Sequence, residues 1–141
     1  MELSELIQSG MTNEATFLVE EEHLARQVGS GSLRVLATPW MITFMERVSH
    51  RLLTCCLPEG QSSVGAWLEV RHLAPTPLGG IVRVRSEVIS VDGIKVFFKV
   101  EAWDEVEQVG VAQHERVVID TGRFFKRIEK KRQQLGLSAG E

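Results

Sequence analysis

Three residues whose side chains could act together in acid–base or nucleophilic chemistry stand in apolar stretches of this sequence. Thr38 and Pro39 open an apolar segment, Glu46 interrupts it, and His72 lies in a later alternating segment. A hydroxyl, a carboxylate and an imidazole can supply a nucleophile, a base and a proton carrier for attack on a carbonyl carbon. Each also has an ordinary alternative: a helix cap for Thr38, a solvated helix residue for Glu46, and a hydrogen-bonded core histidine for His72.

A helix is predicted to begin at Thr38. Threonine is a good N-cap, and Pro39 suits the first helical position because its missing N–H would lack a partner there. Apolar residues then recur at intervals of three and four, at Met41, Phe44, Met45, Val48, Leu52 and Cys55. The pattern ends near residues 57–60, so a long helix with one wide apolar face should lie at the centre of the fold.

After Gly65 the pattern of apolar residues changes from helical to alternating, which predicts a strand. One face of this strand carries Ala66, Leu68, Val70, His72 and Ala74. Turn residues at positions 76–80 separate it from a second strand over residues 81–91, which is rich in valine and isoleucine.

The remaining strands follow a hairpin signal at Asp92-Gly93. Alternation predicts a third strand over residues 94–103, and valines mark a fourth over residues 109–119 that carries the His-Glu-Arg run. Residues 16–19 favour one more strand near the start, and the basic tail is predicted to be helical.

One long helix followed by long antiparallel strands is typical of an α+β domain whose sheet wraps a single helix. The length of 141 residues, with 43% hydrophobic and 25% charged residues, fits one domain over residues 1–141. Its core is expected over about residues 10–130, with a basic helix or tail over about 121–141. An unpaired sheet edge favours a homodimer with a continuous sheet, or a tetramer if two sheets stack.

The two cysteines, Cys55 and Cys56, are adjacent in an apolar segment. This placement fits small buried hydrophobic residues better than a disulfide framework or a zinc site, and it favours a reducing, cytoplasmic location. The first residues lack the basic region and apolar run of a signal peptide, and no apolar stretch approaches the ~18 residues of a membrane span. We therefore expect no targeting and no membrane partner.

The net charge of −3 gives no reason to expect a nucleic acid as partner. Acidic residues collect early, at Glu2, Glu5, Glu14, Glu20, Glu21 and Glu22. Basic residues collect late, at Arg123, Lys126, Arg127, Lys130, Lys131 and Arg132. The two clusters are either solvated faces or, for the basic one, a site for an anionic ligand such as a nucleotide phosphate.

Neither a metal ion nor an organic cofactor is predicted. The four histidines, His23, His50, His72 and His114, form no ligand pair at helical or strand spacing. Gly29-Ser30-Gly31 lacks the lysine and the preceding strand of a phosphate-binding loop. Any chemistry should therefore come from the side chains of the protein alone.

Several short motifs follow one another at characteristic spacing. They are Ala37-Thr38-Pro39-Trp40-Met41, Met45-Glu46, Ser63-Val64-Gly65, Val70-Arg71-His72-Leu73-Ala74-Pro75-Thr76-Pro77 and His114-Glu115-Arg116. Together they resemble the hot-dog-fold thioesterases, and in particular the branch that includes the fluoroacetyl-CoA thioesterase. The resemblance covers about residues 10–130 and is more specific than any single motif, because order and spacing agree.

The resemblance implies roles for the residues at matching positions. In that branch a hydroxyl residue at the helix start, a glutamate two turns later and a strand histidine form the catalytic group, which matches Thr38, Glu46 and His72. Gly65 matches a glycine that lets the thioester approach the backbone, and Arg116 matches an arginine near the site. The expected substrate-binding residues are Pro39, Gly65, His114 and Arg116.

One departure from that branch concerns the segment before the helix. The fluoroacetyl-specific enzyme has phenylalanines there that act as a lid, whereas residues 29–34 of this chain contain no aromatic residue. The resemblance therefore does not extend to selectivity for fluoroacetate.

The residue types fit thioester hydrolysis, which needs a nucleophile or activated water, a base, and donors for the oxyanion. Glu46 and His72 can transfer protons, while Thr38 is either the activated nucleophile or the group that orients water. Free N–H groups at the helix start suit the oxyanion. Because about 12 Å of helix rise separates Thr38 from Glu46, groups from both subunits of a dimer are expected to complete each site.

The resemblance thus implies an acyl-CoA thioesterase that releases free acid and CoA. The alternative from another class is a non-catalytic domain that binds or senses acyl-CoA, since this fold also serves as a ligand-binding module. A hydratase-like lyase would favour an Asp and a His close together after a strand, a pair that this sequence lacks. An acyl carrier protein in place of CoA remains open at this point.

Overall fold

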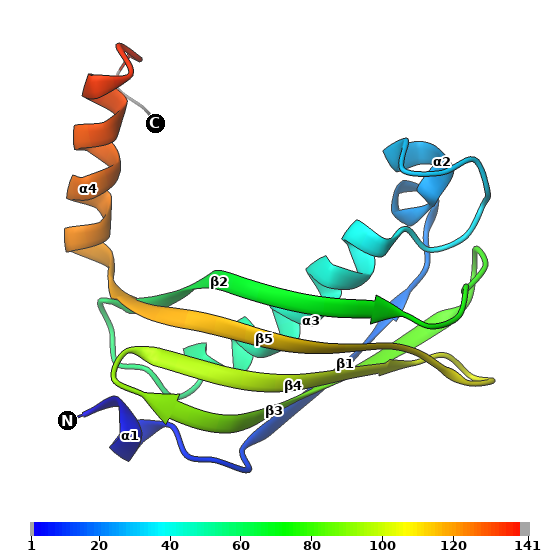
Figure 1. Ribbon diagram of the computed structural model, residues 1–141, viewed down its shortest axis with the longest axis horizontal. Helices are drawn as coiled ribbons and strands as arrows, with labels where there is room; N and C mark the ends of the chain where they lie inside the picture. Colours follow the sequence, from blue (N-terminus) through cyan, green and yellow to red (C-terminus); the bar gives the residue numbers. More distant parts are fainter. Residues whose placement is uncertain (1, 139–141) are drawn as a thin grey trace.

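The computed structural model describes residues 2–138. Its five-stranded antiparallel sheet, in the order β1-β3-β4-β5-β2, curves around helix α3 (Figure 1). The strands are β1 (Thr12–Leu18), β2 (Gln61–His72), β3 (Ile81–Asp92), β4 (Lys95–Trp103) and β5 (Gln108–Asp120). The helical segments are α1 (Leu3–Leu6), the 3-10 turn η1 (Glu21–His23), α2 (Ala25–Val28), α3 (Thr38–Thr54) and α4 (Thr121–Gln134). The predicted α+β fold is confirmed.

Helix α3 begins at Thr38, as predicted, but Thr38 is not its cap. Ala37 occupies the N-cap position with an extended backbone, and no side chain caps the helix. The hydroxyl of Thr38 bonds elsewhere, so the predicted capping role is wrong. Pro39 lies in the first turn, where its missing N–H costs nothing.

The helix ends at Thr54, a few residues before the predicted end. Cys55 is therefore exposed and Cys56 only half-buried, and both are free thiols. The prediction that both cysteines are small buried core residues is wrong for Cys55, whereas Cys56 packs against the core with part of its surface exposed.

The apolar side of α3 forms the core against the concave face of the sheet. Its fully buried residues include Met41, Phe44, Met45, Val48 and Leu53. Burying a side chain of this size contributes about 1.5–3 kcal/mol, so the helix holds the sheet in its curved form. Gly110 on β5 allows the close approach, because a Cβ there would lie 2.5 Å from Sδ of Met41.

Strand β2 contains a β-bulge that the sequence pattern did not predict. It begins at Gln61, before Gly65, and its register with β5 shifts between Gly65 and Trp67. The extra residue, Ala66, is exposed, so its prediction as an inward-facing residue is wrong. The bulge changes which residues face α3, from odd positions such as Ser63 to even positions such as His72.

The sheet has two edges within the described residues. The predicted β3–β4 hairpin forms, but its turn lies one residue later than predicted: Asp92 pairs with Lys95, and the two loop residues are Gly93, at a φ of +61°, and Ile94. β1 pairs only with β3, and β2 pairs only with β5. No helix among residues 2–138 combines the length and apolar composition needed to cross a bilayer.

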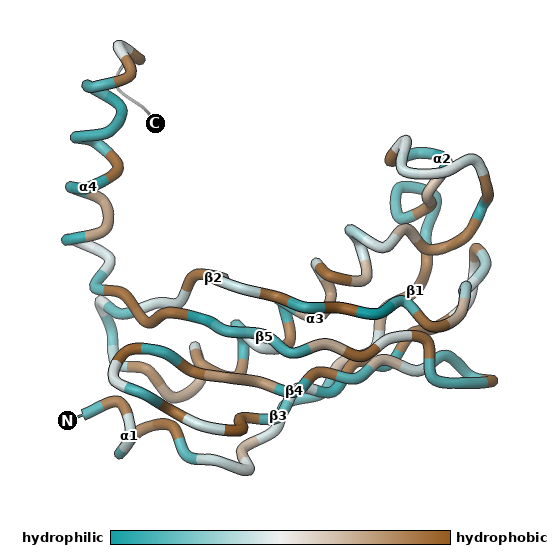
Figure 2. The backbone as a smooth tube through the Cα atoms, viewed as in Figure 1, coloured by the Kyte–Doolittle hydropathy of each residue, from teal (hydrophilic) through white to brown (hydrophobic). Residues whose placement is uncertain are grey.

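Helix α4 confirms the predicted basic helix. It begins directly where β5 ends, because the side chain of Asp120 accepts a hydrogen bond of 2.9 Å from the N–H of Arg123. The hydropathy colouring of Figure 2 shows hydrophilic and hydrophobic positions alternating along this helix. No residue of α4 is buried.

Candidate functional site

The start of α3 and the end of β2 bring Thr38 and His72 together. The Thr38 Oγ1 lies 2.7 Å from the His72 Nδ1, and both residues are half-buried. The His72 Nε2 is buried and has no hydrogen-bond partner among residues 2–138. Burial holds the pKa of His72 below its ordinary value, although the Ala74 backbone partly opposes this. A neutral imidazole beside a hydroxyl can accept its proton.

Glu46, Gly65 and Arg116 form a second group, in the middle of α3 and the facing strands. The Glu46 Oε2 lies 3.5 Å from the Arg116 Nη1, with 43% of the Glu46 side chain exposed against 7% for Arg116. A Cβ added to Gly65 would lie only 2.6 Å from the Glu46 Oε2. Gly65 therefore has to be glycine for the carboxylate to occupy this position.

Strand β5 supplies Arg116, and its neighbours fix the guanidinium. Its Nε donates to the Ser63 hydroxyl at 2.9 Å and its Nη2 to the Ser63 carbonyl at 3.2 Å. Its Nη1 lies 3.2 Å from the His114 Nε2. Burial lowers the pKa of Arg116, and the nearby charge of Glu46 opposes that shift. The cation is thus held rigidly toward a partly exposed carboxylate.

The same network sets the protonation of His114. Its Nδ1 lies 2.8 Å from the carbonyl oxygen of Trp67, so Nδ1 carries the hydrogen and Nε2 accepts from Arg116. Burial lowers the pKa of His114, the Trp67 carbonyl opposes this, and the charge of Arg116 adds to the lowering. His114 is therefore a neutral support for Arg116.

Two members of this network, Ser63 and His50, had no role in the sequence analysis. The Ser63 hydroxyl, which accepts from Arg116, also lies within hydrogen-bond distance of the His50 Nδ1, at 2.9 Å. Burial, followed by the charges of Arg116 and Arg51, lowers the pKa of His50. The helical spacing of four residues from Glu46 to His50 was the available signal, since it places both on one face.

The predicted residues thus form two groups, not one. Among the described residues, no hydrogen bond or ion pair joins Glu46 to Thr38 or His72. Pro39 is exposed, and its carbonyl accepts from the hydroxyl of Thr43. The separation agrees with the helix rise expected between Thr38 and Glu46.

The expected oxyanion donors at the start of α3 are mostly occupied. The N–H groups of Trp40 and Met41 both bond to the carbonyl of Ala37, and Pro39 has no N–H. Of the first four positions of the helix, Thr38 alone offers a backbone donor.

One potential metal-binding group occurs among residues 2–138, away from both groups of site residues. Ligand atoms of Glu20, Glu22 and His23 lie within 4.8 Å of one another. Both carboxylates are exposed, and the His23 Nδ1 already accepts from the N–H of Glu20. This arrangement is a local turn and adds nothing to the candidate site.

We expect acidification to destabilise the protein. His50, His72 and His114 have pKa values lowered from 6.5 in the folded state, so the unfolded chain binds more protons at acidic pH. Their contribution to stability is complete above about pH 6.5 and is lost as pH falls through the lowered folded values. Urea unfolding at about pH 7.5 and about pH 5 should show this loss.

His50→Asn provides the matched control for this prediction. The asparagine amide keeps an acceptor for Ser63 but cannot take up a proton, so the loss of stability on acidification should be smaller than in the wild type. An identical loss in both proteins would show that His50 does not contribute.

The sequence and the fold both resemble those of known proteins. The family described as fluoroacetyl-CoA-specific thioesterase matches residues 19–122. The fluoroacetyl-CoA thioesterase of Streptantibioticus cattleyicolor is 36% identical over 97 residues, which cover 69% of this chain and 70% of the relative.

Solved structures show the same fold. A variant of the fluoroacetyl-CoA-specific thioesterase in complex with fluoroacetate and CoA is 31% identical, with a TM-score of 0.80, covering 84% of this chain and 99% of the other. A hot-dog-like protein from Thermanaerovibrio acidaminovorans is 28% identical, with a TM-score of 0.86, covering 93% of this chain and 97% of the other. The predicted hot-dog fold is confirmed.

Proposed function

This chain belongs to the fluoroacetyl-CoA-specific thioesterase family and hydrolyses acyl-CoA thioesters, and from this premise we propose that Thr38, Glu46 and His72 carry the reaction. The observation that supports the proposal most strongly is the 2.7 Å contact between the Thr38 Oγ1 and the His72 Nδ1. A threonine hydroxyl needs such a neighbouring base to become a useful nucleophile.

In the proposed first step, the Thr38 oxygen attacks the thioester carbonyl carbon and its proton passes to the His72 Nδ1. The tetrahedral intermediate then collapses, the carbon–sulfur bond breaks, and the CoA thiolate takes the proton from His72. The lowered pKa of His72 supports this role, because the imidazole must be neutral to accept a proton.

Water completes the reaction in the proposed second step, with Glu46 as the base. Its carboxylate is 43% exposed, so water can reach it, and Arg116 and Gly65 fix its position. Glu46 takes a proton from water, the hydroxide attacks the acyl carbon, the bond to the Thr38 oxygen breaks, and the proton passes from Glu46 through water to that oxygen. The products are the free acid and the restored hydroxyl.

We propose a homodimer in which β2 of one copy pairs antiparallel with β2 of the other. If the pairing is centred on β2, Gly65 lies opposite position 68 of the second strand, roughly 13 Å along that strand from its histidine at position 72. Within one chain, the distance along the strand from Gly65 to His72 is roughly 23 Å. The dimer therefore brings the Glu46 group of one copy closer to the Thr38–His72 pair of the other than to its own.

For the substrate, we propose a broad class of acyl groups. The exposed residues 29–34 contain no aromatic side chain, so we propose a small or medium acyl group without selectivity for fluoroacetate. Pro39, Gly65, His114 and Arg116 remain the proposed substrate-binding residues. The cytoplasmic location likewise remains a prediction from the unpaired cysteines.

The test is thiol release from a panel of acyl-CoA thioesters, from acetyl to long-chain and aromatic. We expect turnover of short or medium acyl-CoA by the wild type, with fluoroacetyl-CoA not preferred over acetyl-CoA. Binding of acyl-CoA without any turnover would instead support a sensing domain. A preference for fluoroacetyl-CoA of more than about tenfold would contradict the proposal on substrate choice.

A further inference from the structure

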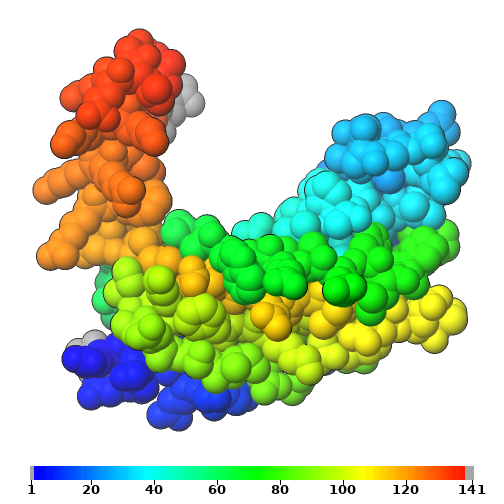
Figure 3. Space-filling view, in the orientation of Figure 1, coloured from blue at the N-terminus to red at the C-terminus, as the bar shows by residue number. Residues whose placement is uncertain are grey.

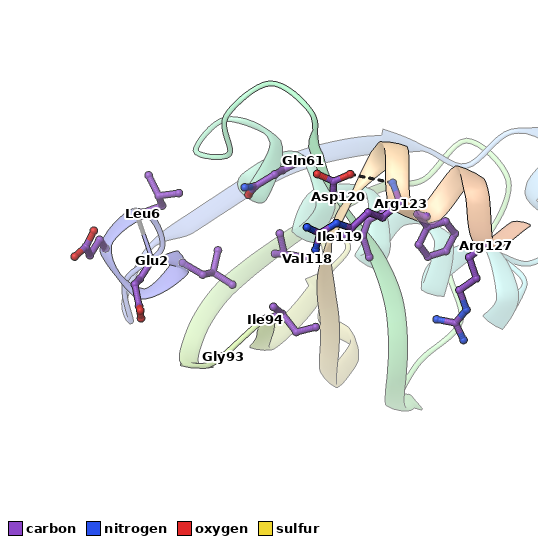
Figure 4. Close-up of a pocket in the computed structure, with 13 residues that line it drawn as sticks. Glu2, Leu6, Gln61, Gly93, Ile94, Val118, Ile119, Asp120, Arg123 and Arg127 are labelled. Atoms are coloured by element: carbon purple, nitrogen blue, oxygen red, sulfur yellow. Dashed lines mark hydrogen bonds between the residues drawn. The ribbon is translucent and has the colours of Figure 1, made fainter.

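Helix α4 receives little support from its own chain. It leaves the sheet after Asp120 and projects away from it (Figures 1 and 3). A cleft of about 940 Å³ lies between the base of α4 and α1, with Arg123 and Arg127 on one side and Glu2 and Leu6 on the other (Figure 4). A lone helix of 14 residues is marginal in water, so a partner that covers it would stabilise it.

The surface of α4 combines apolar side chains with positive charge. Phe125 is 59% exposed, Ile128 is 42% exposed, and Leu135 just beyond the helix is 62% exposed. Their spacing of three and seven residues places them along one side. Helix α4 also has six basic residues and one acidic residue, a net charge of +5, so with −3 for the whole chain the other residues carry −8.

The opposite end of the sheet has the complementary character. We call residues 20–34 and 104–107 the distal end, because they follow β1 and precede β5 at the end of the sheet away from Asp120. The acidic residues there are Glu20, Glu21, Glu22, Asp104, Glu105 and Glu107, against Arg26 and Arg34, which gives a net charge of −4. Leu33 is 68% exposed and Val28 is 41% exposed in the same region.

The dimer geometry brings these two surfaces together. Antiparallel pairing of β2 with its copy reverses the second sheet, so the distal end of the second copy lies beside α4 of the first. Figures 1 and 3 show α4 and α2 rising on the same side of the sheet at its two ends, with a hollow between them above β2. A second copy related by a two-fold axis would fill this hollow.

We propose that α4 is a dimerisation arm that packs on the distal end of a second copy of this chain. The inference rests on the proposed homodimer. Opposite charges and exposed apolar side chains match across the contact, and two-fold symmetry forms it twice. A second copy fits better than an anionic lipid or nucleic acid surface, because the −8 of the other residues would repel such a surface.

The first test is zero-length cross-linking of lysines to carboxylates, in a dimer assembled from isotopically labelled and unlabelled chains. We expect mixed-isotope cross-links between Lys126, Lys130 or Lys131 and carboxylates of the distal end. Lys99, exposed on β4 outside the arm, is the internal control and should give none to the distal end. Cross-links confined to one isotope would place the contact within a chain and overturn the proposal.

The second test is the full-length variant Lys126→Glu/Lys130→Glu, compared by sedimentation with Lys95→Glu/Lys99→Glu, which changes the net charge equally. We expect the first to raise the dimer dissociation constant at least about tenfold at low salt, the control to leave it unchanged, and Glu22→Lys/Glu105→Lys to restore it in part.

The remaining outcomes separate the arm from the proposed function. An unchanged dimer without mixed cross-links would overturn the arm alone, as would binding of α4 to anionic vesicles with dimerisation unaffected. A wild-type chain that is monomeric at all concentrations would overturn both the arm and the proposed homodimer, whereas loss of activity in Glu46→Gln would still support the catalytic proposal.

Discussion

Replacing Glu46 with glutamine should lower kcat for acyl-CoA hydrolysis by about 10²- to 10⁴-fold while the protein remains folded. The amide has nearly the shape of the carboxylate but cannot take a proton from water. Arg116 is only 7% exposed and loses the charge of its partner, so the substitution should also lower the urea midpoint, and the rates are compared without urea, where the variant is folded.

The measurement is the initial rate of thiol release against substrate concentration, together with the urea midpoint of each variant. Glu69→Gln is the control, because it makes the same chemical change at an exposed glutamate on the outer face of β2, outside the Glu46 group. We expect the loss in Glu46→Gln to fall mainly on kcat. A kcat within about threefold of the wild type would rule out Glu46 as the base.

Most of the helices and strands could be predicted from the sequence alone. The periodicity of α3 and the hairpin signal at Asp92-Gly93 placed the helix and most strands correctly, because these elements obey local rules and have one buried face. The buried residues of β4 alternate as predicted, because one face of this strand also packs on the core.

The errors arise where a tertiary contact overrides a local rule. Thr38 followed by proline satisfies every local preference for an N-cap, yet its hydroxyl contacts His72, 34 positions away in sequence. The bulge at Ala66 inserts one residue into a pattern that looks continuous, so the inward face could be read correctly only after it.

The network around Arg116 could not be predicted, because β5 inverts the usual pattern. His114 and Arg116 are buried, while Val111 and Val117 are only partly buried. The usual rule, with hydrophobic residues inside and polar residues outside, would have assigned the wrong face of this strand to the core. Such a local violation costs stability and is expected mainly at functional sites.

Thr38 and His72 should behave as one unit in a double-mutant cycle. We expect Thr38→Val and His72→Ala each to lower kcat/KM by about 10²- to 10⁴-fold, and the double variant to be little worse than either alone. The reason is the 2.7 Å contact, since the hydroxyl is useful only with its base and the base only with its hydroxyl.

Thr43→Val is the matched control for the helix, because Thr43 bonds only the carbonyl of Pro39 in the first turns of α3. Thr38→Ser should retain most of the activity, since it keeps a nucleophilic oxygen beside the His72 Nδ1. Rapid quenching followed by intact mass measurement should detect the acyl group on the wild type but not on Thr38→Val. If the two single losses instead multiply in the double variant, Thr38 and His72 act independently, and Thr38 orients water without being activated by His72.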